Sequence, residues 1–212
     1  CFGYFNLNYE EALEIPIGPD NYIEPARYNG LQPTYFGEVP TYDFRHYCAF
    51  TVNVPMHDGE RVVWHLRRNS KDYSVPGHTE SELYTMYNLF FSSDRGDVGG
   101  AMAPVVRFVD PPGPEGIGKG AGGWKTAEPA MAKVGSPLTL TLGVTQPQPE
   151  DYPEVATYEG DPKSWVVYWW KHSGPPGMVT FSQNRWVLQP DEHTGTTTAT
   201  FSEPGNYVLR MS

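Results

Sequence analysis

The glycine-rich stretch at residues 113–123 comes closest to a nucleotide-binding motif. It runs Gly-Pro-Glu-Gly-Ile-Gly-Lys-Gly-Ala-Gly-Gly, a near-match both to a P-loop and to the G-x-G-x-x-G fingerprint. A P-loop needs Ser or Thr after its Lys to hold Mg²⁺, and either motif needs a helix whose N-terminal amides face the phosphates. Gly120 stands in place of that hydroxyl residue, and the Trp-Lys-Thr-Ala-Glu-Pro that follows predicts no helix. We therefore expect a loop here and no cofactor.

Patterns for catalysis or metal binding are also missing. The six histidines are scattered singly, and the chain has neither an H-E-x-x-H motif for zinc nor a G-x-S-x-G motif for a nucleophilic serine. Two acidic pairs, Asp94 with Asp97 and Glu159 with Asp161, could approach Ca²⁺ but lack EF-hand spacing. The adhesion-type tripeptide Arg-Gly-Asp that ends at Asp97 is interpreted as an ordinary turn. We predict no catalytic residue, no metal and no enzymatic activity.

Composition indicates an all-β protein. Among 212 residues there are 22 Gly and 21 Pro, 14% are aromatic and only 19% are charged, a mixture typical of short strands joined by turns. The formal net charge of −10 would repel a phosphate backbone, and no basic stripe offsets it, so a nucleic-acid partner is not expected. No apolar stretch approaches the roughly 18 residues that a membrane helix requires.

Closely spaced strands are predicted after residue 130. Leu and Thr alternate over 138–142, and a run rich in β-forming residues occupies 165–170. Further strands are expected at 178–181, 186–188, 196–201 and 207–211. This spacing is typical of an Ig-like β-sandwich, to which we assign residues 130–212.

Residues 1–109 are expected to form a separate β-rich domain, and residues 110–129, rich in Gly and Pro, a connector. Alternation over 48–54 and 61–67, with Asp58-Gly59 between them, predicts a hairpin, and a strand at 104–109 ends the domain. Capping-box spacing followed by helical periodicity predicts a short helix near 80–91. The expected fold class is all-β: two Ig-like β-sandwich domains with at most one short helix.

Residues 203–209 match the tyrosine corner of Ig domains. Glu203, Gly205 and Tyr207 occupy the alternate positions that an acidic residue, Gly and Tyr take before strand F, and the Tyr hydroxyl should bond back to the backbone. Leu209 stands where the Ig domain has Cys, so no inter-sheet disulfide is expected. A strand G ordinarily follows, so either the chain is truncated or an edge is left for a partner.

Two cysteines bear on where the protein works. Cys1 opens the sequence, as the acylated Cys of a mature bacterial lipoprotein does, which predicts a lipid anchor. A cut end explains the same feature, and the aromatic Phe2, Tyr4 and Phe5 are unlike the polar tether of most lipoproteins. Cys48 lies in an alternating strand and is expected to be a small buried side chain, with a Cys1–Cys48 disulfide as the alternative.

Tryptophans suggest an interaction surface. Alternation over 165–170 puts Trp165 and Trp169 on one face of a strand and Trp170 on the other, so one face fills the core and the second must be covered or exposed. We predict a surface formed by Trp165, Trp169 and Trp186, suited to a protein partner or to sugar rings. Alternatively, the N-terminal domain or the connector covers the second face.

A set of short segments extends over most of the chain: Ile15-Pro-Ile-Gly, Asn21-Tyr-Ile-Glu-Pro, Phe50-Thr-Val-Asn-Val-Pro and Ala199-Thr-Phe-Ser-Glu-Pro-Gly-Asn-Tyr-Val-Leu. Together they resemble secreted bacterial proteins that carry tandem Ig-like or PKD-like domains and have no assigned activity. The resemblance implies the fold and an extracytoplasmic location, in the periplasm or at the cell surface, and it brings no catalytic residue with it.

Two hypotheses follow. The first is a non-catalytic structural or accessory subunit, held at the membrane through lipidated Cys1 and docked by protein–protein contacts on a larger membrane-associated assembly, for example a respiratory or photosynthetic complex. The second is a carbohydrate-binding or adhesive module whose exposed Trp residues contact glycans.

Overall fold

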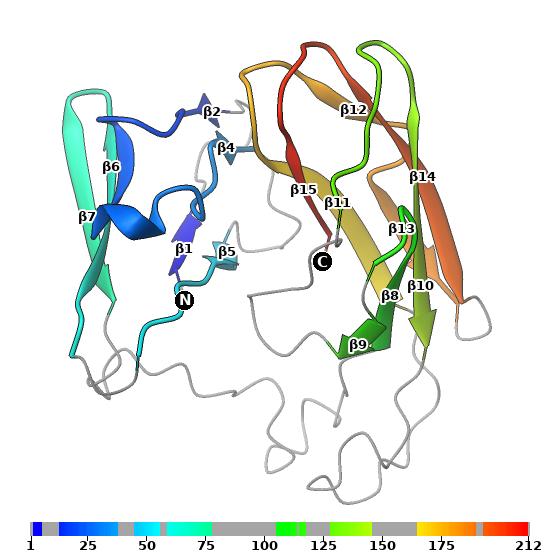
Figure 1. Ribbon diagram of the computed structural model, residues 1–212, viewed down its shortest axis with the longest axis horizontal. Coiled ribbons are helices and arrows are strands. Elements are labelled where there is room, and N and C mark those ends of the chain that lie inside the picture. The colour runs from blue at the N-terminus through cyan, green and yellow to red at the C-terminus, as the bar shows by residue number, and fades with distance from the viewer. Residues whose placement is uncertain are drawn as a thin grey trace, which may run out of the picture.

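The computed structural model describes residues 2–5, 13–37, 45–55, 59–77, 105–113, 115–117, 128–145, 165–189 and 193–211. Within these ranges the chain is all-β, as the sequence predicts, and its only helical element is the 3₁₀ turn η1 (Ala26–Tyr28). The strands form open antiparallel sheets (Figure 1). The helix predicted near residues 80–91 lies outside these ranges. In the part of the chain described, no helix is long and apolar enough to cross a membrane.

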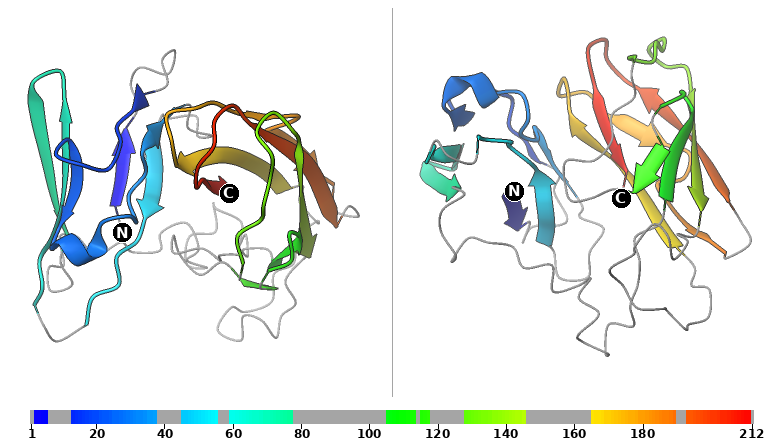
Figure 2. Two further views of the ribbon diagram at one scale, coloured as in Figure 1. Left: turned by 45° about the horizontal axis from the view of Figure 1, so that its top comes forward. Right: turned by 60° about the horizontal axis from the view of Figure 1, so that its bottom comes forward.

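The C-terminal half is a sandwich of two sheets (Figures 1 and 2). One sheet has the order β12–β14–β10–β8–β9 and the other the order β13–β11–β15. The strands are β8 (Val105–Asp110), β9 (Glu115–Ile117), β10 (Leu138–Thr145), β11 (Trp165–Ser173), β12 (Val179–Phe181), β13 (Arg185–Leu188), β14 (Thr194–Phe201) and β15 (Val208–Met211). All strands predicted after residue 130 are therefore confirmed, and the order β8–β10–β14–β12 is the A-B-E-D order of an Ig sheet.

Alternation along the strands builds the core of this sandwich. Even-numbered residues of β10 and odd-numbered residues of β14 point inward, so the leucines of β10 meet small side chains of β14 in the register Leu138↔Ala199. The buried core is aliphatic with two aromatic rings and consists of Leu140, Leu142, Val144, Val167, Trp169, Leu188, Ala199 and Phe201.

Strand β8 belongs to the C-terminal sandwich, whereas the sequence analysis assigns its residues to the N-terminal domain. The segment expected to end the N-terminal domain is β8, and it pairs with β10, while β9 within the expected connector pairs with β8. The C-terminal sheet thus begins at Val105, well before residue 130, and the boundary placed at 109/110 is wrong. Gly and Pro content cannot tell a linker from a loop within one sandwich, because both need the same turn chemistry.

Three small sheets make up the N-terminal half. β1 (Phe2–Phe5) pairs with β5 (Arg45–Phe50), β2 (Leu13–Glu14) with β4 (Tyr35–Phe36), and β6 (Val62–Arg68) lies between β3 (Asn21–Glu24) and β7 (Lys71–Gly77). The predicted hairpin of 48–54 with 61–67 is wrong, because β6 turns back into β7 instead. Asn69 and Ser70 both have positive φ, of 49° and 59°, which suits a two-residue type I′ turn.

A buried amide network holds the N-terminal core together. Trp64 is 2% exposed and packs with Phe2, Phe36 and Phe50. Its Nε1 donates to Asn21 Oδ1 at 3.0 Å, and Asn21 Nδ2 donates to the carbonyls of Ile15 and Pro33 at 2.9 and 2.8 Å. Asn21 therefore ties the core tryptophan to two loop segments whose carbonyls have no strand partner.

Candidate functional site

The predicted tryptophan surface does not form as expected. Trp169 is only 5% exposed and lies in the sandwich core. Trp186 pairs with the core residue Val167 and also points inward, where any side chain at Gly195 of the opposite sheet would overlap its indole. The prediction is wrong for both residues, because the bulky face of the strand pair fills the space between the sheets. The Trp165 side chain lies outside the described part of the chain.

The second face of β11 carries Tyr168 and Trp170, each covered by an arginine. The guanidinium of Arg185 lies 5.5 Å from the centre of the Tyr168 ring, and its Nε donates to the Tyr168 hydroxyl at 2.9 Å. The guanidinium of Arg210 lies 5.7 Å from the Trp170 ring and donates to the carbonyl oxygen of Ala49 in β5. Residues of the N-terminal half thus contribute to covering this face, which was the alternative interpretation of the tryptophan pattern.

A buried lysine forms the centre of the junction between the halves. Lys171, at the end of β11, is 4% exposed, and its Nζ donates to the Glu14 carboxylate of β2 and to the carbonyls of Pro175 and Gly177. The rings of Tyr35 and Tyr207 each lie 5.7 Å from Nζ. All three donor positions of the ammonium are used, as burial of a charge requires.

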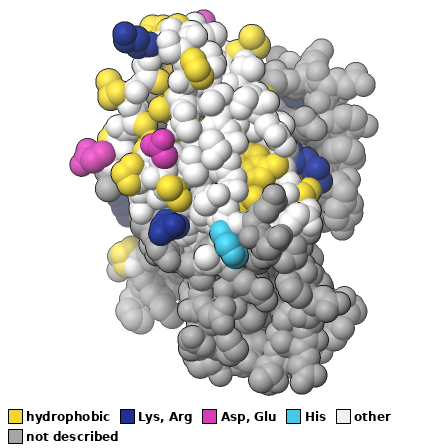
Figure 3. Space-filling model, turned by 90° about the vertical axis from the view of Figure 1, so that its right-hand side faces the viewer, with side chains coloured by type: hydrophobic (Ala, Val, Ile, Leu, Met, Phe, Trp, Pro, Cys, Tyr) yellow, Lys and Arg dark blue, Asp and Glu magenta, His cyan; other side chains and the backbone are white. Residues whose placement is uncertain are grey.

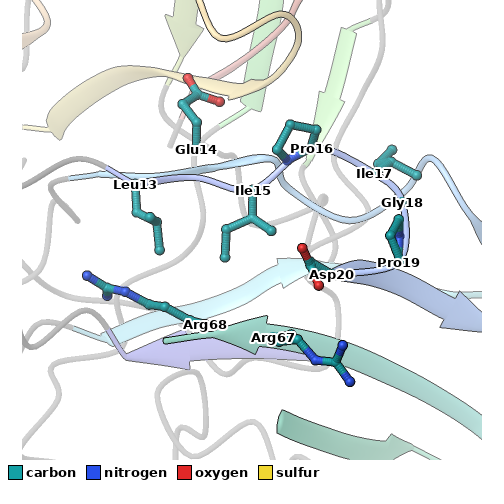
Figure 4. Close-up of a pocket in the computed structure, with 10 residues that line it drawn as sticks. All are labelled: Leu13, Glu14, Ile15, Pro16, Ile17, Gly18, Pro19, Asp20, Arg67 and Arg68. Carbon is teal, nitrogen blue, oxygen red and sulfur yellow. The ribbon is translucent and has the colours of Figure 1, made fainter. Parts of the chain in front are cut away.

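Alternation in β2 explains how Glu14 reaches this lysine. Leu13 and Ile15 point toward the N-terminal core, whereas Glu14 points the opposite way, toward β11 (Figure 4). Backbone contacts reinforce the pairing: Thr34 N donates to His172 O at 3.1 Å, and Gly174 N donates to Thr34 Oγ1 at 3.1 Å. The ring of His172 also contacts Leu31 O at 3.2 Å. We call Glu14, Lys171, Thr34, His172 and Arg210, with the groups they contact, the junction.

Burial shifts the titration of several junction groups. It raises the pKa of Glu14, against the opposing effect of the hydrogen bond from Lys171. It also raises the pKa of Tyr4, which lies near Tyr35 and Arg210, and lowers the pKa of Arg210. Desolvation is the leading cause in each case, so the junction is a low-dielectric contact between the halves.

The tyrosine corner predicted at Glu203, Gly205 and Tyr207 is present. The Tyr207 hydroxyl donates to the backbone oxygen of Glu203 at 3.0 Å. Gly205 has a φ of 148° and lies against Pro175, so only glycine fits there. Because the Tyr207 ring also faces Lys171 Nζ, the corner and the junction share one side chain.

A shallow depression of about 400 Å³ lies next to the junction on the N-terminal half (Figure 4). It is lined by residues 13–20 and by Arg67 and Arg68 of β6. Arg67 is engaged with Asp72, at 2.5 Å between Nε and Oδ1. The depression therefore has mixed charge, and this does not select a ligand class.

Three side chains on the N-terminal sheet have the residue types of a hydrolytic triad. His65 Nδ1 lies 2.9 Å from Ser74 Oγ, and its Nε2 lies 3.4 Å from a Glu24 carboxylate oxygen. Tyr22 stacks on the imidazole at 4.4 Å between ring centres. Ser74 and His65 are direct cross-strand neighbours, and Ser74 is exposed on an edge strand. The geometry is that of a cross-strand pair, and such pairs stabilise a sheet.

The outer face of the five-stranded sheet is rich in threonine. Its outward positions include Thr139, Thr141, Thr180, Thr194, Thr196, Thr198 and Thr200. Cross-strand pairing brings them together, as in the 3.1 Å contact between the hydroxyls of Thr141 and Thr196. Figure 3 shows that this side of the molecule has few charged side chains. This outer face presents hydroxyl and methyl groups, which are compatible with an uncharged binding partner.

The remaining expectations concern metals and residues outside the described ranges. Among the described residues, no three His, Cys, Asp or Glu side chains are grouped to hold a metal ion. Cys1, the Cys48 side chain and most of the glycine-rich segment 113–123 lie outside the described residues. Comparison of the chain with models of protein families, with curated proteins and with solved structures finds no match.

Sequence reasoning missed Glu14, Lys171 and Asn21. A signal existed for the first two, since each is a charged residue beside apolar strand positions: Glu14 between Leu13 and Ile15, and Lys171 directly after Trp170. Their partnership joins positions 157 residues apart, which no local pattern reveals.

Proposed function

We propose that this chain is a non-catalytic structural or accessory subunit whose two β units act as one rigid block. The observation that carries the proposal is the junction. A buried ammonium with three acceptors, one of them a carboxylate from the other half, fixes the geometry between two units far more narrowly than apolar contact alone would. A rigid block of this kind suits a protein that sets the distance between other components.

The host of this subunit is proposed to be a larger membrane-associated assembly on the extracytoplasmic side, such as a respiratory or photosynthetic complex, with lipidated Cys1 as the anchor. The resemblance to secreted tandem Ig-like proteins supports this location. The carbohydrate-binding alternative has weaker support, because Trp169 and Trp186 point into the sandwich.

Purification from native membranes in mild detergent tests the proposal. We expect the protein to co-migrate with defined partner subunits at fixed stoichiometry, and the mass of the N-terminal peptide to include acyl chains on Cys1. A protein that is monomeric and partner-free in such preparations would refute the subunit role. An unmodified Cys1 would refute the anchor alone.

A further inference from the structure

The chain contains a single Asn-Gly sequence, at Asn29 and Gly30 directly after η1. Asparagine before glycine is especially prone to spontaneous deamidation, because glycine has no Cβ to hinder ring closure. In this reaction the Gly30 backbone nitrogen loses its proton and attacks Asn29 Cγ, and ammonia leaves. Water then opens the resulting succinimide ring to aspartate or isoaspartate. Both residues are exposed, so water and base can reach them.

The folded structure opposes ring closure at this dipeptide in three ways. Asn29 Oδ1 accepts from Ile23 N at 2.6 Å and from Gln32 Nε2 at 3.2 Å, which fixes the carboxamide. The attacking nitrogen is also engaged, because Gly30 N donates to Gln32 Oε1 at 2.9 Å. The Asn29 ψ of 138° turns this nitrogen away from the side chain that it would attack.

Gln32 contributes two of these hydrogen bonds and is itself firmly held. Its side chain is 0% exposed, and its Nε2 also donates to Asn21 O at 3.4 Å. Asn21 in turn accepts from the Trp64 indole at the centre of the N-terminal core. A buried amide of the core therefore restrains an exposed and chemically labile dipeptide.

We propose that Asn29–Gly30 is a modification site that Gln32 keeps unreactive in the folded protein, and that it deamidates only in molecules whose N-terminal core has opened. A restrained site reacts through transient opening, so its rate follows the population of the open state. The backbone oxygen of Leu31, the residue after Gly30, contacts the His172 ring at the junction. Isoaspartate adds a methylene group to the backbone beside this contact, so the reaction would also loosen the junction.

The sequence Asn69-Ser70 supplies an internal reference for the test. It forms the exposed β6–β7 turn, and among the described residues no hydrogen bond restrains the Asn69 side chain. Deamidation at both sites is followed by peptide mapping of the whole chain at mildly alkaline pH, in native buffer and in urea. We expect unfolding to accelerate the reaction of Asn29 at least about tenfold more than that of Asn69. Equal acceleration of the two sites would overturn the proposal.

A substitution separates the role of Gln32 from the stability of the core as a whole. Gln32→Met keeps a side chain of similar length and removes both hydrogen bonds to the dipeptide. The matched control is Gln183→Met, at an exposed position of the C-terminal sandwich. In native buffer we expect Gln32→Met to accelerate deamidation of Asn29 at least about tenfold more than it accelerates amide exchange in β6.

Two results with these variants would contradict the role of Gln32. One is an Asn29 rate in Gln32→Met equal to that in the control. The other is an acceleration no larger than that of β6 exchange, which would assign the protection to global stability. If Gln32→Met does not fold, the comparison of Asn29 with Asn69 in the wild type still decides whether the fold protects this site.

Discussion

The two halves enclose a tryptophan in different ways. In the N-terminal half, strands of two to seven residues surround Trp64, and the Asn21 side chain pairs its indole and two loop carbonyls. In the C-terminal sandwich, eight-residue strands β10 and β14 pair along their length, and Trp169 is held by apolar packing with no acceptor for its N–H among the described residues. Regular sheets pair their own backbones, whereas an irregular unit depends on a few buried amides to do so.

Replacement of Asn21 should have the largest effect. Asn21→Ala leaves the Trp64 N–H and the carbonyls of Ile15 and Pro33 buried without partners. We expect a loss of about 4 kcal/mol in the free energy of unfolding, measured by urea denaturation. Asn53→Ala, at an exposed position, is the control. A loss equal to that of the control would show that the N-terminal core does not depend on the amide.

The junction should give the next largest effect. Glu14→Ala leaves the Lys171 ammonium buried without its carboxylate, at a cost of about 3 kcal/mol. The double variant Glu14→Ala/Lys171→Met should lose less free energy of unfolding than the two single variants together, and we expect the difference to be on the order of 1–3 kcal/mol. Strictly additive losses in the denaturation curves would contradict a coupled Glu14–Lys171 pair.

Matched tryptophan substitutions measure the difference between the two cores directly. Both Trp64→Phe and Trp169→Phe leave a cavity, but only Trp64→Phe also leaves Asn21 Oδ1 without its donor. We expect Trp64→Phe to be more destabilising by about 2 kcal/mol in urea denaturation. The contrast fails if the two losses are equal.

The tyrosine corner should contribute less. Tyr207→Phe removes the hydroxyl that bonds Glu203 O and keeps the ring beside Lys171. A loss of about 1 kcal/mol is expected by thermal denaturation. Tyr73→Phe, at a side chain that is 52% exposed, should leave Tm unchanged. A Tyr207→Phe protein as stable as this control would assign the corner to the ring alone.

The smallest effect concerns pH. Burial raises the pKa of Glu14, so the folded state binds the proton of this carboxyl more tightly than the unfolded state does. Protonation of Glu14 therefore stabilises the fold, and this stabilisation is present at low pH. It declines as the pH rises from the ordinary value of 4.5 through the raised pKa. The Tm of the wild type, relative to that of Glu14→Gln, should therefore fall across this window. Glu128→Gln, at an exposed position, serves as the control. A flat or rising difference would contradict the direction of the shift.

The sequence predicts the strands of the sandwich well, because alternating segments such as 138–142 and 196–201 indicate which side chains face the core. It predicts the corner at Tyr207 for a different reason, since that motif is local and its hydrogen bond spans four residues. The strand predicted at 104–109 is present as β8, but its pairing with β10 could not be inferred, because the two strands are separated by a long segment of the chain.

The junction and the N-terminal core were harder to predict. Alternation shows that Glu14 opposes Leu13 and Ile15, but the identity of its partner depends on how the halves pack. The β6–β7 turn at Asn69-Ser70 lacks the Gly of the strongest hairpin signals, so the more familiar Asp58-Gly59 turn misled the pairing. The prediction of a tryptophan surface was wrong because a strand with large residues on both faces does not reveal which face is internal.

The placement of β8 also bears on limited proteolysis. The glycine-rich segment follows β8 and β9 in the chain and precedes β10, and β8 and β10 are neighbours in one sheet. A protease that cleaves between residues 118 and 127 would therefore produce two fragments that share a β-ladder from Val105 to Asp110. The fragments should remain together in native buffer and separate only in denaturant, so a nicked preparation would elute as an intact molecule while showing two bands on a denaturing gel.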